Sequence, residues 1–287
     1  MSASPNPVGT LYLVPAPLDF GCSTQSPLAH SLPSETLRIA AGLQHWICEN
    51  AKSTRAYLKR IAETHPLSLP LQSLDLQELP REVHKKGDHL PDHGKGVHAA
   101  GRGKGVHLPG QGPGDSTKGG PVWDARAMLK PALVGNAIGL ISEAGMPAIA
   151  DPGSSIVRAA HDLGIPVVPL VGPVSLLLAL AASGLNGQNF AFVGYVPSAP
   201  AERAQRIREL ETLALKTGQT QLFIETPYRN EALLQTLLQS LQHNTRLATA
   251  SGLTLGNAEI HSGFTKQWKA DGWALRNDTP TVFGIGR

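Results

Sequence analysis

The chain has 287 residues, of which 41% are hydrophobic, and its only cysteines are Cys22 and Cys48. This length suits two domains, at roughly 150 residues each, and two cysteines exclude a disulfide framework, which favours a reducing compartment. The formal net charge of +3 does not by itself indicate a nucleic-acid surface, because much of the excess lies in one Lys/Arg/His-rich stretch.

Short apolar runs alternate with helix-like segments at the start of the chain. Residues 10–14 (TLYLV) predict a strand that ends at Pro15 and Pro17. Helical spacing follows at residues 35–44 and 53–62, on either side of a short strand at 46–48. This alternation predicts strands connected by helices, as in a mainly parallel sheet.

Residues 80–121 differ in composition from the rest of the chain. Glycine, lysine and histidine dominate there, and the sequence GKGVH occurs twice, at residues 94–98 and 103–107. Such a segment buries too little apolar area to offset the entropy of its chain. We therefore interpret it as a flexible insertion into the first domain.

The strand and helix pattern resumes after the insertion. We expect a helix at 122–133, a strand at 137–142, a helix at 154–163, a strand at 167–171 and a buried helix at 173–183. The apolar run at 167–185 contains Pro169, Gly172, Pro173 and Gly184 and lacks basic flanks, so it favours this strand and helix over a membrane span. No secretory signal is recognisable at the start of the sequence, and we expect no membrane association and a cytoplasmic location.

A second α/β unit is expected to follow. Its predicted elements are strands at 189–194 and 221–225, helices at 201–215 and 228–241, and three final strands at 246–250, 259–263 and 280–285. We expect the final strands to be antiparallel, because no helix of crossover length separates all of them. The predicted fold class is thus α/β with two α/β domains, at residues 1–172 and 173–287.

The most informative segment is ISEAGMPAIADPG at residues 141–153. It is a strand that ends in a loop of small residues and prolines before a helix, a pattern that lets backbone groups approach a ligand at the carboxyl edge of a sheet. Its carboxylates, Glu143 and Asp151, suit a cationic or amino-bearing ligand better than a phosphate. The alternative is a tight turn in which Asp151 caps the helix.

Residues 141–153 and GPVS at 172–175 resemble signatures of the tetrapyrrole methylase superfamily of S-adenosylmethionine-dependent methyltransferases. The similarity is to the branch that contains ribosomal RNA small subunit methyltransferase I. Further similar segments follow in the right order: GTLYLV at 9–14, FVGYVP at 192–197 followed by Glu202 and Arg203, and FIETPYR at 223–229. The resemblance covers nearly everything except the insertion.

This resemblance implies two α/β domains of the tetrapyrrole methylase type, with the cofactor S-adenosylmethionine in the cleft between them, and a homodimer. It requires no metal. It places Pro15, Ser142, Glu143, Ala144, Gly145, Ile149, Ala150 and Asp151 on the methionine side of the cofactor and Ser175 at the domain junction. It places Glu225, Thr226, Pro227, Ser251, Gly252, Leu253, Thr279 and Pro280 on the adenosine side.

Two charged motifs of the branch are altered here. Residues 49–55 read ENAKSTR: Glu49 and Arg55 are kept, but Asn50 replaces an acid of the branch and Lys52 replaces an arginine. Residues 252–255 read GLTL and lack the acid and the lysine that the branch has there. A ribose hydroxyl needs a base or a nearby cation to lose its proton. Glu49 is the candidate general base, with Lys52 and Arg55 holding an anionic substrate, although a salt-bridged, solvated helix start is an alternative.

Three hypotheses about function stay open. The first is an S-adenosylmethionine-dependent methyltransferase that acts on ribosomal RNA in the small ribosomal subunit, by ribose 2′-O-methylation. Because the two motifs are changed, the chain would then be a paralogue whose substrate is altered. The second is a methyltransferase of small, tetrapyrrole-like molecules. The third is a catalytically silent S-adenosylmethionine-binding protein.

Overall fold

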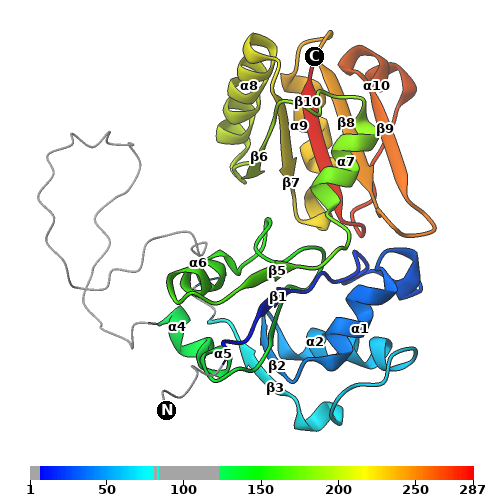
Figure 1. Cartoon of the computed structure of the whole chain (residues 1–287). Helices are drawn as coiled ribbons and strands as arrows, with labels where there is room; N and C mark the ends of the chain where they lie inside the picture. The colour runs from blue at the N-terminus through cyan, green and yellow to red at the C-terminus, as the bar shows by residue number, and fades with distance from the viewer. Residues whose placement is uncertain (1–6, 81–82, 84–122) are drawn as a thin grey trace, which may run out of the picture.

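The computed structural model describes residues 7–80, 83 and 123–287. The predicted insertion at 80–121 therefore lies outside the described residues, apart from Pro80 and Val83. Two five-stranded sheets lie one above the other in Figure 1, each covered by helices. This arrangement confirms the predicted fold class, whereas the domain boundary at residues 172 and 173 stays a prediction.

The first sheet is entirely parallel, as the alternation of strands and helices predicts. Its strands are β1 (Leu11–Leu13), β2 (His45–Cys48), β3 (Asp75–Glu78), β4 (Ile138–Ile141) and β5 (Val167–Pro169), in the order β3-β2-β4-β1-β5. The carboxyl ends of its two neighbouring central strands, β1 and β4, lie at the same edge. Loops that follow these strands therefore meet above the sheet.

Helices cover both faces of the first sheet. These helices are α1 (Ser34–Gly42), α2 (Ala51–Ala62), α4 (Ala125–Met128), α5 (Lys130–Leu133) and α6 (Ser154–Asp162). Helices α1 and α2 pack on one side in a buried cluster that includes Leu58 and Trp46, and α4 to α6 pack on the other with Leu11 and Ile138. The central strands β2 and β4 are thus buried on both faces, as is typical of parallel sheets, whereas the edge strands β3 and β5 are partly exposed.

The single helix predicted at 122–133 is wrong, because two four-residue helices, α4 and α5, occupy this stretch. Leu129 between them leaves helical geometry, with φ −93° and ψ 2°. Pro131 lies in the first turn of α5, where its missing N–H is tolerated but where a continuous helix would lose a hydrogen bond. Strand β3 was not predicted, because its sequence DLQE is polar and partly exposed at the sheet edge.

The second sheet is mixed. Its strands are β6 (Phe190–Tyr195), β7 (Thr220–Ile224), β8 (Arg246–Ser251), β9 (Glu259–Phe264) and β10 (Thr281–Gly286), in the order β6-β7-β10-β8-β9. Strands β6 and β7 are parallel, and β7, β10, β8 and β9 pair antiparallel in turn. The prediction that the final strands are antiparallel is confirmed.

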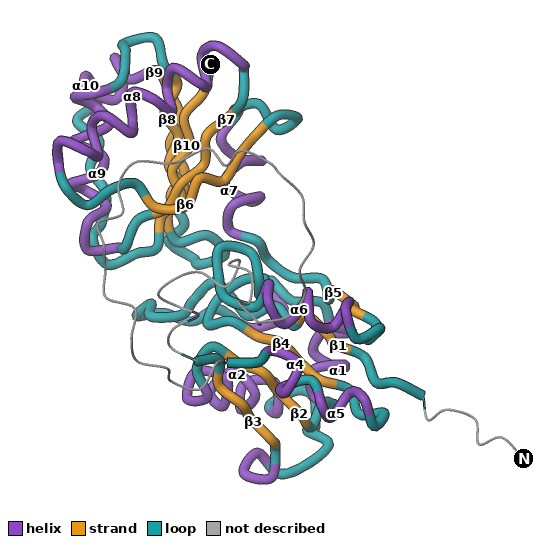
Figure 2. Tube along the Cα trace, turned by 90° about the vertical axis from the view of Figure 1, so that its left-hand side faces the viewer, coloured by secondary structure: helices purple, strands orange, loops and turns teal. Residues whose placement is uncertain are grey.

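Helices α8 (Pro200–Thr217), α9 (Asn230–Ser240) and α10 (Thr265–Asp271) lie on one face of this sheet, and α7 (Ser175–Ser183) lies on the other (Figure 2). Short 3-10 helices are η1 (Leu28–His30), η2 (Leu71–Ser73) and η3 (Pro227–Arg229). Helix α10 was not predicted. Among the helices that the structure describes, none combines the length and the apolar character needed to cross a bilayer.

The prediction of a buried helix at 173–183 is only half right. One face of α7 packs on the second sheet through Leu176, Ala179 and Leu180. The other face leaves Leu177 and Leu178 exposed at 48% and 40%. A helix that is apolar all round but covered on one side indicates a surface that binds something further.

The connection between β5 and α7 depends on Gly172. A Cβ atom at this position would lie 2.3 Å from Cγ of Pro15 and 2.4 Å from its Cβ. The proline ring is rigid and lies two residues after the end of β1, so it cannot move without moving the loop after β1. Gly172 therefore lets the two segments approach closely.

We expect Gly172→Ala to lower the free energy of unfolding by about 1–3 kcal/mol, since overpacking forces the backbone to shift. Urea unfolding monitored by circular dichroism measures the effect. The matched control is Gly187→Ala, where a Cβ atom meets nothing within 4 Å. Equal stability of the two variants would contradict the close approach.

Candidate functional site

The loop that follows β4 is held in an unusual backbone conformation. Two of its alanines, Ala148 and Ala150, have positive φ angles of 66° and 65°, and Gly145 and Gly153 have φ 69° and 136°. Positive φ strains a residue with a Cβ atom and persists only where the surroundings fix it. Such strained loops gather at ligand-binding sites.

Two backbone hydrogen bonds join this loop to the loop that follows β1. Ala16 N–H donates to the Gly145 carbonyl at 2.9 Å, and Gly145 N–H donates to the Ala16 carbonyl at 3.0 Å. On the other side, Cβ at Gly145 would lie 3.3 Å from Leu18. The two loops therefore form one unit above the carboxyl edge of the first sheet.

A cavity of about 420 Å³ lies between this unit and the second sheet. This volume is in the range of small-molecule sites, roughly 300–1,000 Å³. We call it the interdomain cavity. It is lined by Leu18, Phe20, Gly21, Ala144, Gly145, Met146, Ile149, Ala150, Asp151, Val174, Ser175, Leu176, Tyr195, Ile224, Glu225, Thr226, Pro227, Ala250, Gly252, Leu253, Asp278, Pro280, Thr281 and Val282.

Most of the residues that the resemblance assigns to a cofactor meet in this cavity. They are Ala144, Gly145, Ile149, Ala150, Asp151, Ser175, Glu225, Thr226, Pro227, Gly252, Leu253 and Pro280. They come from the loop after β4, from the first residue of α7, from the segments that follow β7 and β8, and from the segment before β10, which are far apart in the sequence. The fold thus brings together residues that the sequence places on both sides of one ligand.

Five predicted residues do not line the interdomain cavity. Pro15 is buried, and its carbonyl accepts a hydrogen bond of 3.0 Å from Tyr57. Ser251 and Thr279 are buried beside the cavity; Ser251 Oγ lies 2.8 Å from Thr281 Oγ1, and Thr279 donates to Asp278 at 2.8 Å. Ser142 and Glu143 line a different cavity.

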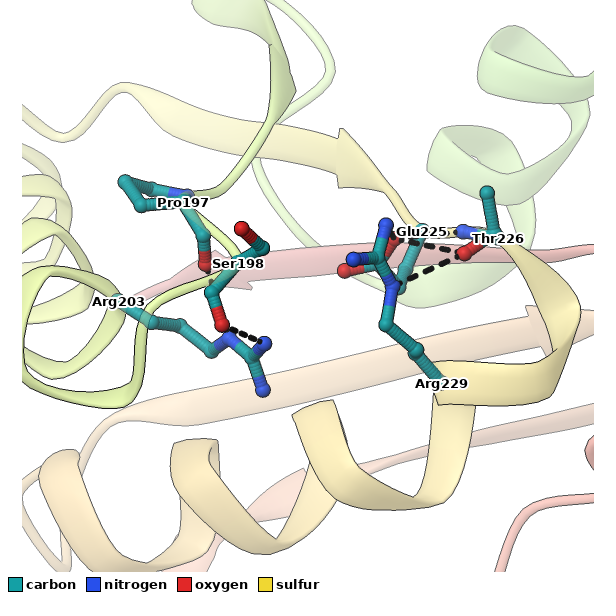
Figure 3. A network of polar contacts seen from close by, with 6 residues as sticks. All are labelled: Pro197, Ser198, Arg203, Glu225, Thr226 and Arg229. Atoms are coloured by element: carbon teal, nitrogen blue, oxygen red, sulfur yellow. Dashed lines mark hydrogen bonds and ion pairs between the residues drawn. The ribbon is translucent and has the colours of Figure 1, made fainter.

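Glu225 is a buried, hydrogen-bonded carboxylate of the interdomain cavity (Figure 3). Its side chain is completely buried, and Oε1 accepts hydrogen bonds of 2.7 Å from Arg229 Nη2 and 2.7 Å from the Thr226 N–H. Oε2 is also buried, and it has no hydrogen-bond partner among the described residues. A buried carboxylate oxygen without a partner costs free energy, so it indicates a hydrogen-bond donor on a ligand.

A buried arginine fixes the neighbouring loop after β6. Arg203 Nε donates to the Pro197 carbonyl at 3.0 Å, and Nη2 donates to the Ser198 carbonyl at 2.7 Å (Figure 3). This loop follows Tyr195, which lines the interdomain cavity and was not predicted as a site residue. The signal was present, because Tyr195 belongs to the FVGYVP segment that carries part of the resemblance.

Asp151, which lines the interdomain cavity, lies close to two further carboxylates, those of Glu49 and Glu143. Burial, and then the nearby charges of Glu49 and Glu143, raise the pKa of Asp151 to about 7. Glu49 Oε2 accepts a hydrogen bond of 3.1 Å from the Glu143 N–H. The acids oppose each other's ionisation, so a cation placed among them relieves the repulsion. The N-cap residue of α6 is Gly153, so Asp151 is not itself the N-cap.

A second cavity, of about 440 Å³, lies beside α2. We call it the α2 cavity. Phe20 and Gly21 line both cavities, which therefore meet at this loop. The α2 cavity is lined by Ala16, Pro17, Asp19, Phe20, Gly21, Gln25, Asn50, Lys52, Ser53, Thr54, Ala56, Tyr57, Arg60, Ile141, Ser142 and Glu143.

The candidate catalytic residues divide between the α2 cavity and its surroundings. Lys52 lines the cavity, Glu49 lies half-buried next to Glu143, and Arg55 is exposed and lines neither cavity. Asn50 caps α2, with Oδ1 accepting from the N–H groups of Lys52 at 2.8 Å and Ser53 at 3.3 Å. An asparagine caps as well as an acid, so this change from the motif of the branch preserves the start of α2.

Asp151 gives the site a pH dependence. Its folded pKa of about 7 lies above the ordinary value near 3.8, so the folded state binds more protons between these values and stability falls as the pH rises through this window. We expect the Asp151→Asn variant to lack this pH-dependent loss of stability. Its free energy of unfolding should therefore rise by roughly 2–4 kcal/mol relative to that of the wild type between about pH 4 and pH 8. Urea unfolding at both pH values measures the difference. A difference between the two proteins that is the same at both values would contradict the raised pKa.

Comparison with known proteins identifies the family. A family model described as Tetrapyrrole (Corrin/Porphyrin) Methylases matches residues 81–267, more than half of the chain. The chain therefore belongs to the tetrapyrrole methylase family, as the sequence motifs predict. Uroporphyrin-III-C-methyltransferase from Thermus thermophilus has a solved structure that covers 97% of this chain and 94% of its own, with a TM-score of 0.48 and 18% identity.

Curated relatives share the name ribosomal RNA small subunit methyltransferase I. The protein from Vibrio cholerae is 35% identical over 130 residues, which are 45% of this chain and 44% of the relative. The protein from Mesorhizobium japonicum is 36% identical over 146 residues, which are 51% of this chain and 48% of the relative. The chain thus matches about half the length of these relatives.

Proposed function

We propose that this chain is a methyltransferase that binds S-adenosylmethionine in the interdomain cavity. The observation that carries the proposal is the pairing of two carboxylate sites across that cavity, in a chain of the tetrapyrrole methylase family. Asp151 with its neighbours suits the sulfonium and amino groups of the cofactor. Glu225 Oε2 suits a ribose hydroxyl or an amino donor.

The apolar walls of the cavity fit the rest of this ligand. Ile224, Leu253 and Val282 lie beside Glu225 and Pro280 on the second sheet's side, where a flat adenine ring would exclude water. The small residues Ala144 and Gly145 leave room for the methionine part against the loop backbone. This division follows the two sides that the resemblance implies.

The methyl acceptor that we propose is ribosomal RNA, at a ribose 2′ hydroxyl, because the relatives from Vibrio cholerae and Mesorhizobium japonicum bear the name ribosomal RNA small subunit methyltransferase I. When bound, S-adenosylmethionine supplies an electrophilic methyl group. The enzyme's task is to align the acceptor oxygen in line with that group. An RNA substrate of this kind would be met in the cytoplasm.

In this reaction the acceptor oxygen forms a bond to the methyl carbon, the carbon–sulfur bond breaks, and its electron pair stays on sulfur. The acceptor proton needs a base. Glu49 is our candidate, because its carboxylate is held by the Glu143 N–H close to Asp151. Lys52 lines the neighbouring cavity and would hold the phosphate that flanks the acceptor.

The first test is calorimetric titration with S-adenosylmethionine and S-adenosylhomocysteine. We expect both compounds to bind saturably. Glu225→Gln should weaken the binding of both about tenfold or more, because the amide N–H₂ of the glutamine would face a hydrogen-bond donor of the ligand. Gln219→Glu, an alteration outside both cavities, is the control. Absence of binding to the wild-type protein would overturn the proposed cofactor.

The second test is transfer of labelled methyl groups to small ribosomal subunits and to their isolated RNA. We expect label in the RNA, and Glu49→Gln should lower the transfer rate about 100-fold or more while cofactor binding persists, because a general base typically contributes 10²–10⁴-fold. Transfer to a tetrapyrrole but to no RNA would favour the small-molecule alternative. Cofactor binding without any transfer would favour the silent protein.

We also propose that the chain forms a homodimer through α7 and β5. Val168, Val171, Leu177 and Leu178 are exposed at 38%, 70%, 48% and 40%, and α7 and β5 lie on the same side of the molecule in Figure 2. A second copy would cover this apolar surface, which a monomer rarely exposes. The homodimer implied by the sequence resemblance agrees with this surface.

Sedimentation velocity tests the dimer. We expect Leu177→Glu combined with Leu178→Glu to convert a dimer to a monomer, because two charges would be buried without partners. The control is Leu213→Glu, since Leu213 is exposed at 42% on α8, on the opposite face of the second sheet. A wild-type monomer at micromolar concentration would contradict the proposal.

A further inference from the structure

The α2 cavity contains a buried hydroxyl to which none of the described residues is hydrogen-bonded. Ser142 is exposed at only 4%, and its Oγ has no hydrogen-bond partner among the described residues. Sequence resemblance assigns Ser142 to the cofactor, but the residue lines the α2 cavity and not the interdomain cavity. A buried hydroxyl without a partner costs free energy, so its position favours a ligand in the α2 cavity.

Phe20 gives the same cavity an aromatic wall. It is exposed at 46% and lines both cavities at the point where they meet. The residue before it is anchored, because Asp19 accepts hydrogen bonds of 3.0 Å and 2.9 Å from Arg60. Arg60 also donates to the Ser26 carbonyl at 2.7 Å. The loop that carries Phe20 is thus anchored to α2, and an exposed ring held in this way can stack on a flat ligand.

The charges of the α2 cavity are few and are separated. Asp19 is neutralised by Arg60 in a pair that is buried on the acid side. Glu143 lies at the end of the cavity that adjoins the interdomain cavity, beside Glu49. Lys52 is exposed on the first turn of α2. A ligand with an anionic group would place that group at Lys52 and away from the acids.

We infer that the α2 cavity receives a single nucleotide of the RNA acceptor, extruded from its neighbours, with its base on Phe20, a polar atom at Ser142 Oγ and its phosphate at Lys52. The inference rests on the proposed function and assigns the substrate subsite of that activity. Enzymes that modify nucleic acids take the target nucleotide out of its stack, and proteins read unstacked RNA bases by stacking on aromatic rings and by hydrogen bonds. A volume of about 440 Å³ accommodates one such unit, and the shared wall at Phe20 leads to the methyl group.

The test is titration of the protein, saturated with S-adenosylhomocysteine, with the four ribonucleoside 5′-monophosphates, followed by NMR or calorimetry. We expect at least one mononucleotide to bind with a dissociation constant in the millimolar range or below. Inorganic phosphate and free ribose are titrated in parallel and should bind more weakly. Absence of binding by every mononucleotide at about 10 mM overturns the inference.

Variants at Phe20 and Lys52, each with a matched control, locate the binding. Phe20→Ala should weaken mononucleotide binding about tenfold, since base stacking on an aromatic ring is sequence-tolerant but strong, and Phe20→Trp should restore it. Phe190→Ala, with a ring exposed at 41% on β6, is the control. Lys52→Ala should weaken binding of the mononucleotide, whereas Lys59→Ala, an exposed lysine on the same helix, should not.

Ser142→Ala separates a ligand role from a structural one. Because Ser142 Oγ has no partner in the described structure, its removal should leave the unfolding midpoint unchanged or raise it, while mononucleotide binding falls. A lowered unfolding midpoint with unchanged nucleotide binding overturns the role assigned to Ser142.

Methyl transfer to small-subunit RNA distinguishes this inference from the proposed function. If mononucleotides bind in the α2 cavity but no RNA is methylated, the acceptor in the proposed function fails and the nucleotide site stands. If RNA is methylated and the Phe20, Ser142 and Lys52 variants keep the wild-type KM for RNA, the inference fails and the proposed function stands.

Discussion

The candidate site depends on one pair of backbone hydrogen bonds, between Ala16 and Gly145. Strands β1 and β4 are neighbours in a parallel sheet, so their following loops leave the sheet side by side. The pair at 2.9 Å and 3.0 Å fastens these loops into one unit, and both cavities are built against it. The bridge holds the strained loop after β4 against the loop that carries Phe20, and the ion pair of Asp19 with Arg60 anchors that second loop to α2.

The bridge also explains how the site tolerates unfavourable features. Ala148 and Ala150 adopt positive φ, and Asp151 is placed near Glu49 and Glu143 although burial, and then each of these acids, raises its pKa. Natural folds keep such strain where the surrounding structure over-determines it and where a ligand benefits. A cation among the acids would lower the pKa of Asp151, so ligand binding and proton release are coupled at this site.

Much of the fold and part of the site could be predicted from the sequence. Hydrophobic periodicity located most strands and helices, and the motif at residues 141–153 located the loop that borders both cavities. The apolar spacing continues across Leu129 and therefore predicts one helix, whereas Pro131 prevents the hydrogen bond that a continuous helix would need there. Strand β3 was missed because it is polar, and its pairing with β2 supplies the stability that its own sequence does not.

The sequence could not separate the two cavities, because one short loop contributes to both. Ser142 and Glu143 line the α2 cavity, whereas Ala144 and Gly145, the next two residues, line the interdomain cavity. A motif names consecutive residues but not the direction in which the chain turns after β4, and that direction is set by the bridge to Ala16. The loop after β4 therefore separates two adjoining cavities, and Phe20 lies where these cavities meet. A methyl donor on one side of this loop and an acceptor on the other would meet beside Glu143, close to Glu49, the carboxylate that we propose as the base for the acceptor's proton.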